Sequence, residues 1–436
     1  MVERAYKYRF FPTTEQENLL RRTMGCVRLV YNKALATKIE GWYQRQERID
    51  YKQTSSLLTS WKKTEDLDFL NEVSSVPLQQ CLRHLQKAFA NFWGKRAKHP
   101  RFKVKRNGGS AEFTKSAFKF TNNSLWLAKC QEPLNIVWSR LLPDGTSPST
   151  VTVKLEPSGR WFVSLLVDDP TVQPLSPTNK KVGIDRLLTT SDGDKITNPK
   201  HFNRLYQKLK VAQKELSRKT KGSNNRYKAR LKVAKIHAKI KDARTDFLHK
   251  LTTDLVRANS IIVIEDLAIR NMVKNHKLAR SISDTAWGKM FRQLEYKCEW
   301  YGRTLVKIDR FFPGSKRCNH CGFIMDALQG MPLDIRSWDC PSCETKEIDR
   351  NINVGKNILA AGLAVEVASD RVSRPVYDDR IVCGADIRPD RHSSKARRAV
   401  AGVPPVVLKD TPSDKATEQE GQLRKTSRGK KQKPKS

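Results

Sequence analysis

Four cysteines in the C-terminal half of the sequence have the spacing of a metal site. Cys318 and Cys321 form one Cys-x-x-Cys pair, Cys340 and Cys343 form a second, and 18 residues separate the pairs, as in a zinc ribbon. Four thiolates placed in this way give the closed tetrahedral site of a structural Zn²⁺ ion. A chance arrangement or disulfide pairing is the alternative, and a reducing compartment disfavours disulfides. We therefore predict a structural zinc site.

The remaining thiols and the histidine of the first knuckle are not expected to bind this metal. His320 lies between Cys318 and Cys321 and is expected at the surface. The other cysteines have no partner at metal-binding spacing, so we interpret them as small apolar residues or unpaired thiols. These are Cys26, Cys81, Cys130, Cys298 and Cys383.

Two carboxylates follow apolar runs that read as buried strands. Asp185 comes after residues 182–184, and Glu265 comes after residues 261–264. If the strands lie side by side, both carboxylates meet at one sheet edge, where they repel unless divalent cations hold them. Two Mg²⁺ ions about 4 Å apart at such an edge would stabilise the attacking and leaving oxygens in phosphodiester cleavage. Taken singly, an acid at the end of a strand is usually only a turn residue or a helix cap.

The segments around these acids predict an α/β domain. Residues 182–190, 261–264 and 305–308 read as strands, with two helices in the first interval and one in the second. Residues 201–250 hold 16 basic and 3 acidic side chains and are divided at residues 222–225, which predicts a helical hairpin with basic outer faces. Because so few acids are present to pair with them, we favour nucleic-acid contact over a solvated helix pair.

The N-terminal half predicts strands and helices of a second domain. Residues 5–11 read as a strand, Thr14 with Glu17 suggests a capping box for a first helix, and Pro77 opens a second helix. Alternating apolar residues at 151–155 and 161–167 flank a turn and indicate an antiparallel hairpin. Together with the first strand, the hairpin suggests a small β-barrel interleaved with the helices.

A basic stretch with interleaved aromatic residues follows the second helix. Lys95, Arg96, Arg101 and Lys103 lie in it, close to Phe102. This composition suits phosphate neutralisation combined with base stacking. A solvated loop beside a small core is the alternative.

The charge of the whole chain indicates a polyanionic partner. The 436 residues include 83 Lys and Arg against 45 Asp and Glu, a net charge of +38. Residues 369–436 contribute 17 basic and 9 acidic side chains, a net of +8, so +30 belongs to the preceding residues. Nucleic acid is the expected partner of such a body. With no apolar run of the length that a membrane span needs, we expect no membrane contact and a cytoplasmic, nucleoid-associated location.

Several motifs resemble those of the TnpB family, transposon-encoded relatives of type V CRISPR effectors. They are VGID at 182–185, VIED at 263–266, SKRCNHCG at 315–322, CPSC at 340–343 and EIDRNINVGKNIL at 347–359. The resemblance extends to AYKYRFFPTTEQ, EVSSVPLQQCLRHLQKAF and SISDTAWGKMFRQLEYKCEWYGR, and so covers residues 5–365.

The resemblance implies an α+β architecture with defined domain boundaries. The expected parts are a wedge β-barrel (1–10 and 123–170), a helical recognition domain (11–122), a linker (171–180), a RuvC-type RNase H-like α/β domain (181–310 and 345–365), a zinc-ribbon target-loading segment (311–344) and a disordered basic tail (366–436). It also implies RNA-guided recognition and Mg²⁺-dependent cleavage of DNA, in which base pairing supplies the sequence specificity. Asp185 and Glu265 would be the first two catalytic carboxylates.

The sequence departs from the family pattern at the third catalytic position. The family has Asp-Arg-Asp-x-Asn, whereas this chain has Asp349, Arg350, Asn351, Ile352 and Asn353. A neutral amide can offer an oxygen to Mg²⁺ but contributes no charge. Leu187 also stands where the family usually has glycine, and the segment to Asp192 is shorter than expected.

We therefore predict an RNA-guided DNA-binding protein whose RuvC site is impaired. The alternatives are a working Mg²⁺-dependent endonuclease that uses Asp349, and a guide-independent nucleic-acid-binding repressor. The expected partners are guide RNA and target DNA, and we expect a monomer or a weak dimer on nucleic acid. The expected nucleic-acid contacts are Lys95, Arg96, Arg101, Lys103, Lys316 and Arg317.

Overall fold

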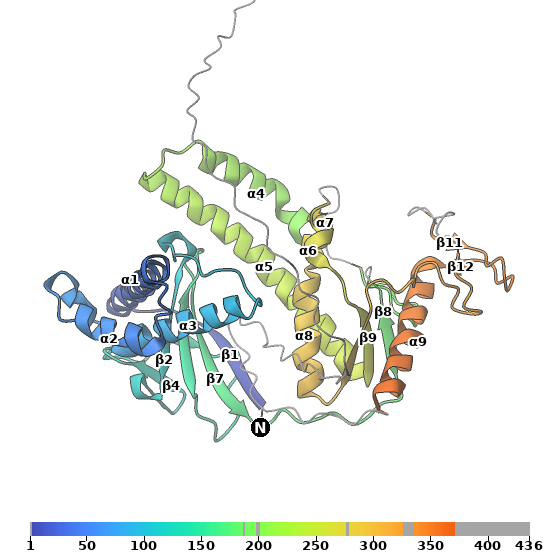
Figure 1. Cartoon of the computed structure of the whole chain (residues 1–436), viewed down its shortest axis with the longest axis horizontal. Coiled ribbons are helices and arrows are strands. Elements are labelled where there is room, and N and C mark those ends of the chain that lie inside the picture. Colours follow the sequence, from blue (N-terminus) through green and yellow to red (C-terminus); the bar gives the residue numbers. More distant parts are fainter. Residues whose placement is uncertain (1, 186–187, 198–200, 276–278, 326–334, 371–436) are drawn as a thin grey trace, which may run out of the picture. The chain divides into compact units, whose positions relative to one another are not determined.

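A computed structural model describes residues 2–185, 188–197, 201–275, 279–325 and 335–370 (Figure 1). The helices before residue 171 are α1 (Thr14–Arg45), α2 (Tyr51–Trp61) and α3 (Ser75–Trp93), with short 3-10 helices at Glu65–Asn71, Lys105–Asn107 and Lys115–Ala117. The strands there are β1 (Val2–Phe10), β2 (Gly109–Thr114), β3 (Phe118–Thr121), β4 (Ser124–Leu127), β5 (Ile136–Val137), β6 (Thr150–Leu155) and β7 (Trp161–Asp169).

The second half of the described chain mixes longer helices with short strands. Its helices are α4 (His201–Ser217), α5 (Asn224–Ala258), α6 (Ile269–Met272), α7 (Ala279–Thr285), α8 (Trp287–Trp300) and α9 (Arg350–Asp370). Its strands are β8 (Lys181–Ile184), β9 (Ile261–Glu265), β10 (Thr304–Ile308), β11 (Ser337–Trp338) and β12 (Ile348–Asp349).

The N-terminal strands form a five-stranded antiparallel sheet in the order β2-β6-β7-β1-β5. The hairpin predicted from alternation is confirmed as β6 and β7, with Val151 opposite Leu165. Both side chains are fully buried, because every second residue of a strand points to the same face of the sheet. β3 and β4 form a separate two-stranded ladder. Closure of these strands into a barrel stays a prediction.

The sheet takes in residues that we expected to lie among the helices. β2 pairs with β6 along its full length. After the helices, the strands of the sheet therefore begin at Gly109 and not at residue 123, where the second wedge segment was expected to start. Residues 109–114 form a strand of this sheet because Ala111 and Phe113 are buried in the core while their neighbours are not. This alternation lies beside a basic loop, and the pairing partner is some 40 residues away in the sequence.

The N-cap of helix α1 lies one residue before the predicted cap. Thr13 and not Thr14 is the N-cap: its hydroxyl accepts from the Gln16 N–H, and the Gln16 side chain accepts from the Thr13 N–H. The capping box is therefore Thr13 with Gln16 instead of Thr14 with Glu17, because Thr13 has the extended backbone that an N-cap needs. Helices α1, α2 and α3 share an apolar core.

The C-terminal sheet is parallel, in the order β10-β9-β8. Successive residues of β9 point to opposite faces of the sheet and pack in two different cores. Ile262 and Ile264 pack with α5 and α8, whereas Ile261 and Val263 pack with α9. Figure 1 shows the sheet between α8 and α9. The predicted order of strands and helices is confirmed up to β9, but the described residues between β9 and β10 form three helices, α6, α7 and α8, where one was predicted. The carboxyl ends of β8 and β9 lie at the same edge.

Strand β8 is shorter than the predicted strand at 182–190. It ends at Ile184, and the chain returns so that Thr190 forms an antiparallel bridge with Ile184. Leu188 has a φ of 61°, and the Leu188 N–H donates to the Asp185 carbonyl at 3.1 Å. Leu187, where the family usually has glycine, lies outside the described residues.

Helix α9 crosses the sheet at close range. A Cβ on Gly183 of β8 would lie 2.2 Å from the Gly355 carbonyl oxygen. A Cβ on Gly355 would in turn lie 2.9 Å from the Ser191 backbone nitrogen. Glycine at both positions therefore lets the first turns of α9 lie against β8 and its return segment.

The helical hairpin predicted for residues 201–250 is confirmed, and the predicted end of the last domain is passed by one helix. Helices α4 and α5 form the predicted hairpin, in which Leu209 and Ala212 of α4 and Ile240 of α5 are buried. Helix α9 continues to Asp370, beyond the boundary expected at residue 365. The predicted disordered tail lies otherwise outside the described residues. In the part of the chain that the structure describes, no helix has the length and apolarity to span a membrane.

Candidate functional site

The four predicted zinc ligands lie together. Their Sγ atoms are all within 4.8 Å of one another, and the Cys318–Cys343 and Cys321–Cys340 sulfur pairs are both 3.7 Å apart. Tetrahedral zinc with Zn–S bonds of about 2.3 Å places its sulfurs about 3.8 Å apart, whereas a disulfide needs about 2.05 Å. The cysteines are free, so the cluster can hold a metal ion such as Zn²⁺.

Two turns and a short ladder set the positions of the sulfurs. The Cys318 N–H donates to the Phe323 carbonyl at 2.8 Å, and the Cys340 N–H donates to the Thr345 carbonyl at 2.9 Å. Hydrogen bonds from Thr345 lower the pKa of the Cys343 thiol to about 6, which favours the thiolate that a metal needs. Trp338 and Ile348, paired across β11 and β12, pack against the cluster. His320 is exposed, as expected.

Two buried asparagines of α9 hold the first knuckle against the helix. Asn353 Oδ1 accepts from the Asn319 N–H at 2.9 Å, and Asn353 Nδ2 donates to the Arg317 carbonyl at 2.8 Å. Asn357 Nδ2 donates to the carbonyls of Gly314 and Arg317, at 3.0 and 2.6 Å. No role for this pair of asparagines was predicted from the sequence. The signal was present, since two asparagines four residues apart share one face of a helix.

The first two acids of the predicted magnesium site lie at neighbouring strand ends. Ile184 is in register with Ile264 across the parallel pair, so Asp185 and Glu265 follow at the same level of the sheet. Asp185 is buried, 3% exposed, and its Oδ1 accepts from the Thr189 N–H at 2.8 Å. Glu265 is half-buried at the end of β9. Ile184 and Ile264 both face α5 and α8, so strand alternation directs the next two side chains towards α9.

The alternative third acid, Asp349, is engaged by protein donors. Its Oδ1 accepts from the N–H groups of Asn351 and Ile352, at 2.9 and 3.1 Å, which is the geometry of an N-cap for α9. Its Oδ2 lies 2.6 Å from Lys195 Nζ. Burial alone would raise the pKa of Asp349, but the hydrogen bonds from Lys195, Ile352 and Asn351 outweigh it and lower the pKa.

Asn351, at the family position of the third ligand, lies half-buried in the first turn of α9. Among the described residues, metal-ligating side chains gather in a group of three or more only at the four cysteines. The structure thus brings Asp185 and Glu265 to one sheet edge, and it does not gather them with Asp349 into a carboxylate cluster.

The predicted nucleic-acid contacts differ in their surroundings. Lys95 and Arg101 are exposed, and Arg96 is exposed but donates to Asn91 Oδ1 at 3.1 Å. The Lys103 ammonium lies 4.0 Å from the centre of the Tyr31 ring, and desolvation lowers its pKa, although the residue as a whole is exposed. Lys316 and Arg317 are half-buried beside the first zinc knuckle.

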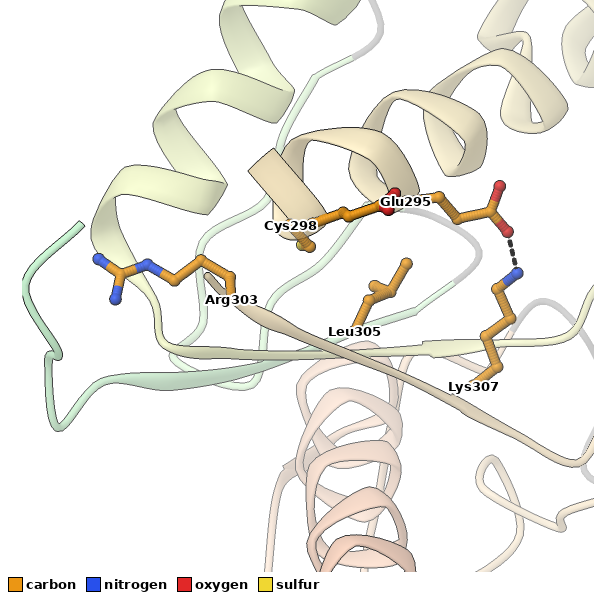
Figure 2. Close-up of a pocket in the computed structure, with 6 residues that line it drawn as sticks. Glu295, Cys298, Arg303, Leu305 and Lys307 are labelled. Carbon is orange, nitrogen blue, oxygen red and sulfur yellow. Dashed lines mark hydrogen bonds and ion pairs between the residues drawn. The ribbon is translucent and has the colours of Figure 1, made fainter. Parts of the chain in front are cut away.

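A shallow depression of about 440 Å³ lies between α8 and β10 (Figure 2). Glu295 of α8 and Lys307 of β10 pair with each other there, and the Arg303 Nε–H donates to the Val256 carbonyl at 3.1 Å. None of the carboxylates at the β8 and β9 strand ends lines it. The depression is therefore separate from the candidate nuclease site.

Family models match three segments of the chain. A model described as "Helix-turn-helix domain" matches residues 1–47, one described as "Probable transposase" matches residues 161–276, and one described as "Cas12f1-like, TNB domain" matches residues 287–358. The first model covers β1 and the whole of α1, the second runs from β7 to beyond the end of α6, and the third contains the four cysteines and Asn351.

Curated relatives match most of the chain. A protein of Streptomyces pristinaespiralis described as "Putative RNA-guided DNA endonuclease" is 54% identical over 92% of this chain and 98% of its own length. A relative from Escherichia coli K12 with the same description is 32% identical over 86% of this chain and 96% of its own length. A solved Cas12f1-sgRNA-target DNA complex matches with 14% identity and a TM-score of 0.49, over 79% of this chain and 83% of that one. On the identity and coverage of these curated relatives, together with the matching family models, the chain belongs to the TnpB family of transposon-encoded proteins.

Proposed function

We propose that this protein binds a guide RNA and the DNA that pairs with it, and that its RuvC-type nuclease site is impaired. The relatives described as RNA-guided DNA endonucleases support the binding half of the proposal. The charge supports it too, because +38 on 436 residues suits a heteroduplex backbone. The observation that carries the impairment is the environment of the third ligand position.

The third ligand position has no carboxylate, and the nearest carboxylate that could replace it, Asp349, is already hydrogen-bonded by protein donors. Asn351 is neutral, and both oxygens of Asp349 already accept hydrogen bonds. Three protein donors already share the two oxygens of Asp349, and the Lys195 ammonium beside Oδ2 would repel a divalent cation placed there. A metal ligand at Asp349 would also leave residue 351 without a negative charge.

Asp185 and Glu265 remain suitable for one half of a magnesium site. Mg²⁺ at this edge would supply charge stabilisation for the oxygens of a phosphodiester. The chain's own contribution is to keep Asp185 oriented through the Thr189 N–H and to place Glu265 beside it by strand register. With two carboxylates instead of three, we expect the affinity for Mg²⁺ and the transition-state stabilisation to be lower.

The test is cleavage of guide-matched DNA in Mg²⁺ by the purified RNA complex of the wild type and of Asn351→Asp. We expect wild type to bind the DNA with little cutting, and Asn351→Asp to gain cutting with unchanged binding. Asp185→Ala in the Asn351→Asp background is the control and should remove the gain. Wild-type cleavage as fast as in nuclease-active relatives measured alongside would refute the impairment.

The alternative is a working endonuclease that uses Asp349. It predicts that Asp349→Ala abolishes cleavage by the wild-type complex while DNA binding persists. The Lys195 pair gives a further discriminating variant: Lys195→Met should raise cleavage if release of Asp349 limits it, and should leave cleavage unchanged if Asp349 serves only as a cap.

A guide-independent repressor is the candidate from another class. Sequencing the RNA that copurifies with the protein separates it from the guided protein. A discrete RNA species supports a guide, whereas heterogeneous RNA, or DNA binding that survives ribonuclease treatment, supports the repressor.

A further inference from the structure

A cavity of about 310 Å³ lies where the C-terminal ends of α1 and α3 meet. Its lining includes Trp42 of α1, Phe92 and Trp93 of α3, and Arg48 and His99 from the segments that follow these helices. We call these five residues with the space between them the aromatic cavity. Its volume is at the lower end of the range of about 300–1,000 Å³ for small-ligand pockets.

The cavity exposes large aromatic surface to solvent. Trp42 is 42% exposed, Phe92 36% and Trp93 47%. The Arg48 guanidinium lies 5.6 Å from the ring centres of both Trp42 and Trp93, so a planar cation already stacks with the two indoles. Clustered exposed aromatic groups mark binding sites more often than they serve stability, and a flat partner is the kind that these rings accept.

The floor of the cavity is held in place by buried groups. Lys38 is 6% exposed, and its Nζ donates to Gln86 Oε1 at 3.0 Å and to the Ile49 carbonyl. The same ammonium lies 5.4 Å from the centre of the Phe89 ring. These contacts tie α1, α3 and residue 49 together, so the cavity is formed before any ligand arrives.

A strongly basic loop starts at the rim. Residues 94–106 contain seven Lys and Arg and no acid. His99 packs edge-on against Phe89 and Phe92, with ring centres 5.4 and 5.2 Å apart. At the far end, Asn32 exchanges hydrogen bonds of 3.0 and 2.8 Å with the Lys103 backbone. The loop is thus fixed at two points, with exposed Arg101 between them.

We propose that the aromatic cavity binds an unpaired base of an RNA strand whose phosphates contact the loop at residues 94–106. Base stacking on aromatic rings and guanidinium planes, beside basic side chains that neutralise phosphates, is the common chemistry of single-strand recognition. RNA is the favoured occupant because its loops, bulges and ends present splayed bases, whereas bases in duplex DNA are stacked inside. The inference rests on the proposed function in that this RNA would be the guide.

A second copy of the chain is a poorer fit to the same surface. An apolar face can bury itself in a dimer, but here each copy would bring the seven basic side chains of residues 94–106 to the rim, against one acid, Glu47, in the cavity lining. Like charges placed opposite each other oppose association. A nucleic-acid strand supplies the complementary charge.

The test is binding of the full chain to a 20-nucleotide single-stranded oligo(A) RNA, with a duplex RNA of matched length as comparison, by fluorescence anisotropy. Trp42→Ala and Trp93→Ala should each weaken single-strand binding about tenfold, in line with the loss of one stacked base, and leave duplex binding unchanged. Trp93→Phe should keep most of the affinity. Phe69→Ala removes an aromatic residue of matched exposure, 41%, in an acidic segment, and should have no effect.

Salt dependence separates stacking from charge. Arg101→Gln should reduce the slope of log affinity against log salt by about 0.7, as expected for one phosphate contact on a single strand. The tryptophan variants should keep the wild-type slope. Circular dichroism and thermal melting establish that each variant is folded.

Three results would overturn the inference. One is unchanged RNA binding in folded Trp42→Ala and Trp93→Ala. Another is a loss of single-stranded DNA binding with RNA binding intact. The third is a change from dimer to monomer in sedimentation with RNA binding intact, which would assign the cavity to self-association. Because none of these measurements uses cleavage or a matched target, they can fail while the proposed function stands.

Discussion

Lys195 Nζ lies 2.6 Å from Asp349 Oδ2, and the other oxygen of that carboxylate caps α9. The pair joins the return segment after β8 to the first turn of the helix that carries Asn351. An ammonium therefore stands against the carboxylate that is the alternative candidate for the third ligand. These contacts hold the N-terminal end of α9 against the return segment.

The cap should matter more for stability than the ion pair. Asp349→Ala removes the acceptor for two N–H groups of α9 and should lower the free energy of unfolding by about 0.5–2 kcal/mol. Lys195→Met removes a pair whose lysine is 56% exposed, so the loss should be below about 1 kcal/mol. Urea unfolding at pH 7 measures both. A larger loss for Lys195→Met than for Asp349→Ala would contradict this assignment.

Zinc should be stoichiometric and should depend on the cysteine cluster. We expect one Zn²⁺ per chain by elemental analysis, and a lower melting temperature after chelation, since metal binding contributes directly to folding. Cys318→Ser should lose the metal. Cys130→Ser, outside the cluster and half-buried, is the matched control and should retain it. Retention of zinc by Cys318→Ser would show that the ion binds elsewhere.

The knuckle should loosen when its asparagine contacts are removed. Asn353→Ala leaves the Asn319 N–H and the Arg317 carbonyl without this side chain, at a cost of about 1–3 kcal/mol for a buried group left unpaired. Hydrogen exchange should speed up locally at the Asn319 amide, which donates to Asn353. Faster exchange throughout the chain, with no local excess, would mean a general loss of stability instead.

The close approach of α9 to β8 predicts opposite effects for the same substitution in two helices. Gly355→Ala places a Cβ 2.9 Å from the Ser191 backbone nitrogen and should destabilise the protein. Gly25→Ala in α1 meets nothing within 4 Å and should stabilise by about 0.5–1 kcal/mol, because alanine loses less backbone entropy. Thermal melting of both variants tests the pair. Equal effects would exclude the packing explanation.

Lys297 should give the protein a distinctive pH dependence. Its ammonium is buried in α8 and donates to the His249 carbonyl and to the hydroxyls of Thr252 and Thr253. Desolvation lowers its pKa from 10.5 to about 8. Between these values the unfolded chain binds more protons, so the free energy of unfolding should rise with pH by up to about 1.4 kcal/mol per unit.

Lys297→Met provides the control for that slope. The difference in unfolding free energy between wild type and variant should change across pH 8 to 10.5 and stay level between pH 6 and 7.5. A difference that is constant from pH 6 to 10.5 would mean that the lysine has an ordinary pKa in the folded state.

The sequence by itself determined the parts whose information is local. The spacing of Cys318, Cys321, Cys340 and Cys343 was enough to predict the cluster, because a two-residue gap already lets two thiolates reach one ion. Period-two alternation predicted the β6–β7 hairpin, because the alternation of buried and exposed residues is also set by neighbours in the sequence. Apolar runs ending in Asp185 and Glu265 predicted neighbouring strand ends, which the parallel register of β8 and β9 confirms.

Only the tertiary structure decided what depends on distant segments. The sequence placed Asp349 near Asn351, but the Lys195 pair joins residues 154 positions apart and gives the carboxylate a second partner. The aromatic cavity likewise forms only where the ends of α1 and α3 meet. Helical and strand periods are set within a few residues, whereas such meetings are set by the packing of whole elements, which no short pattern records.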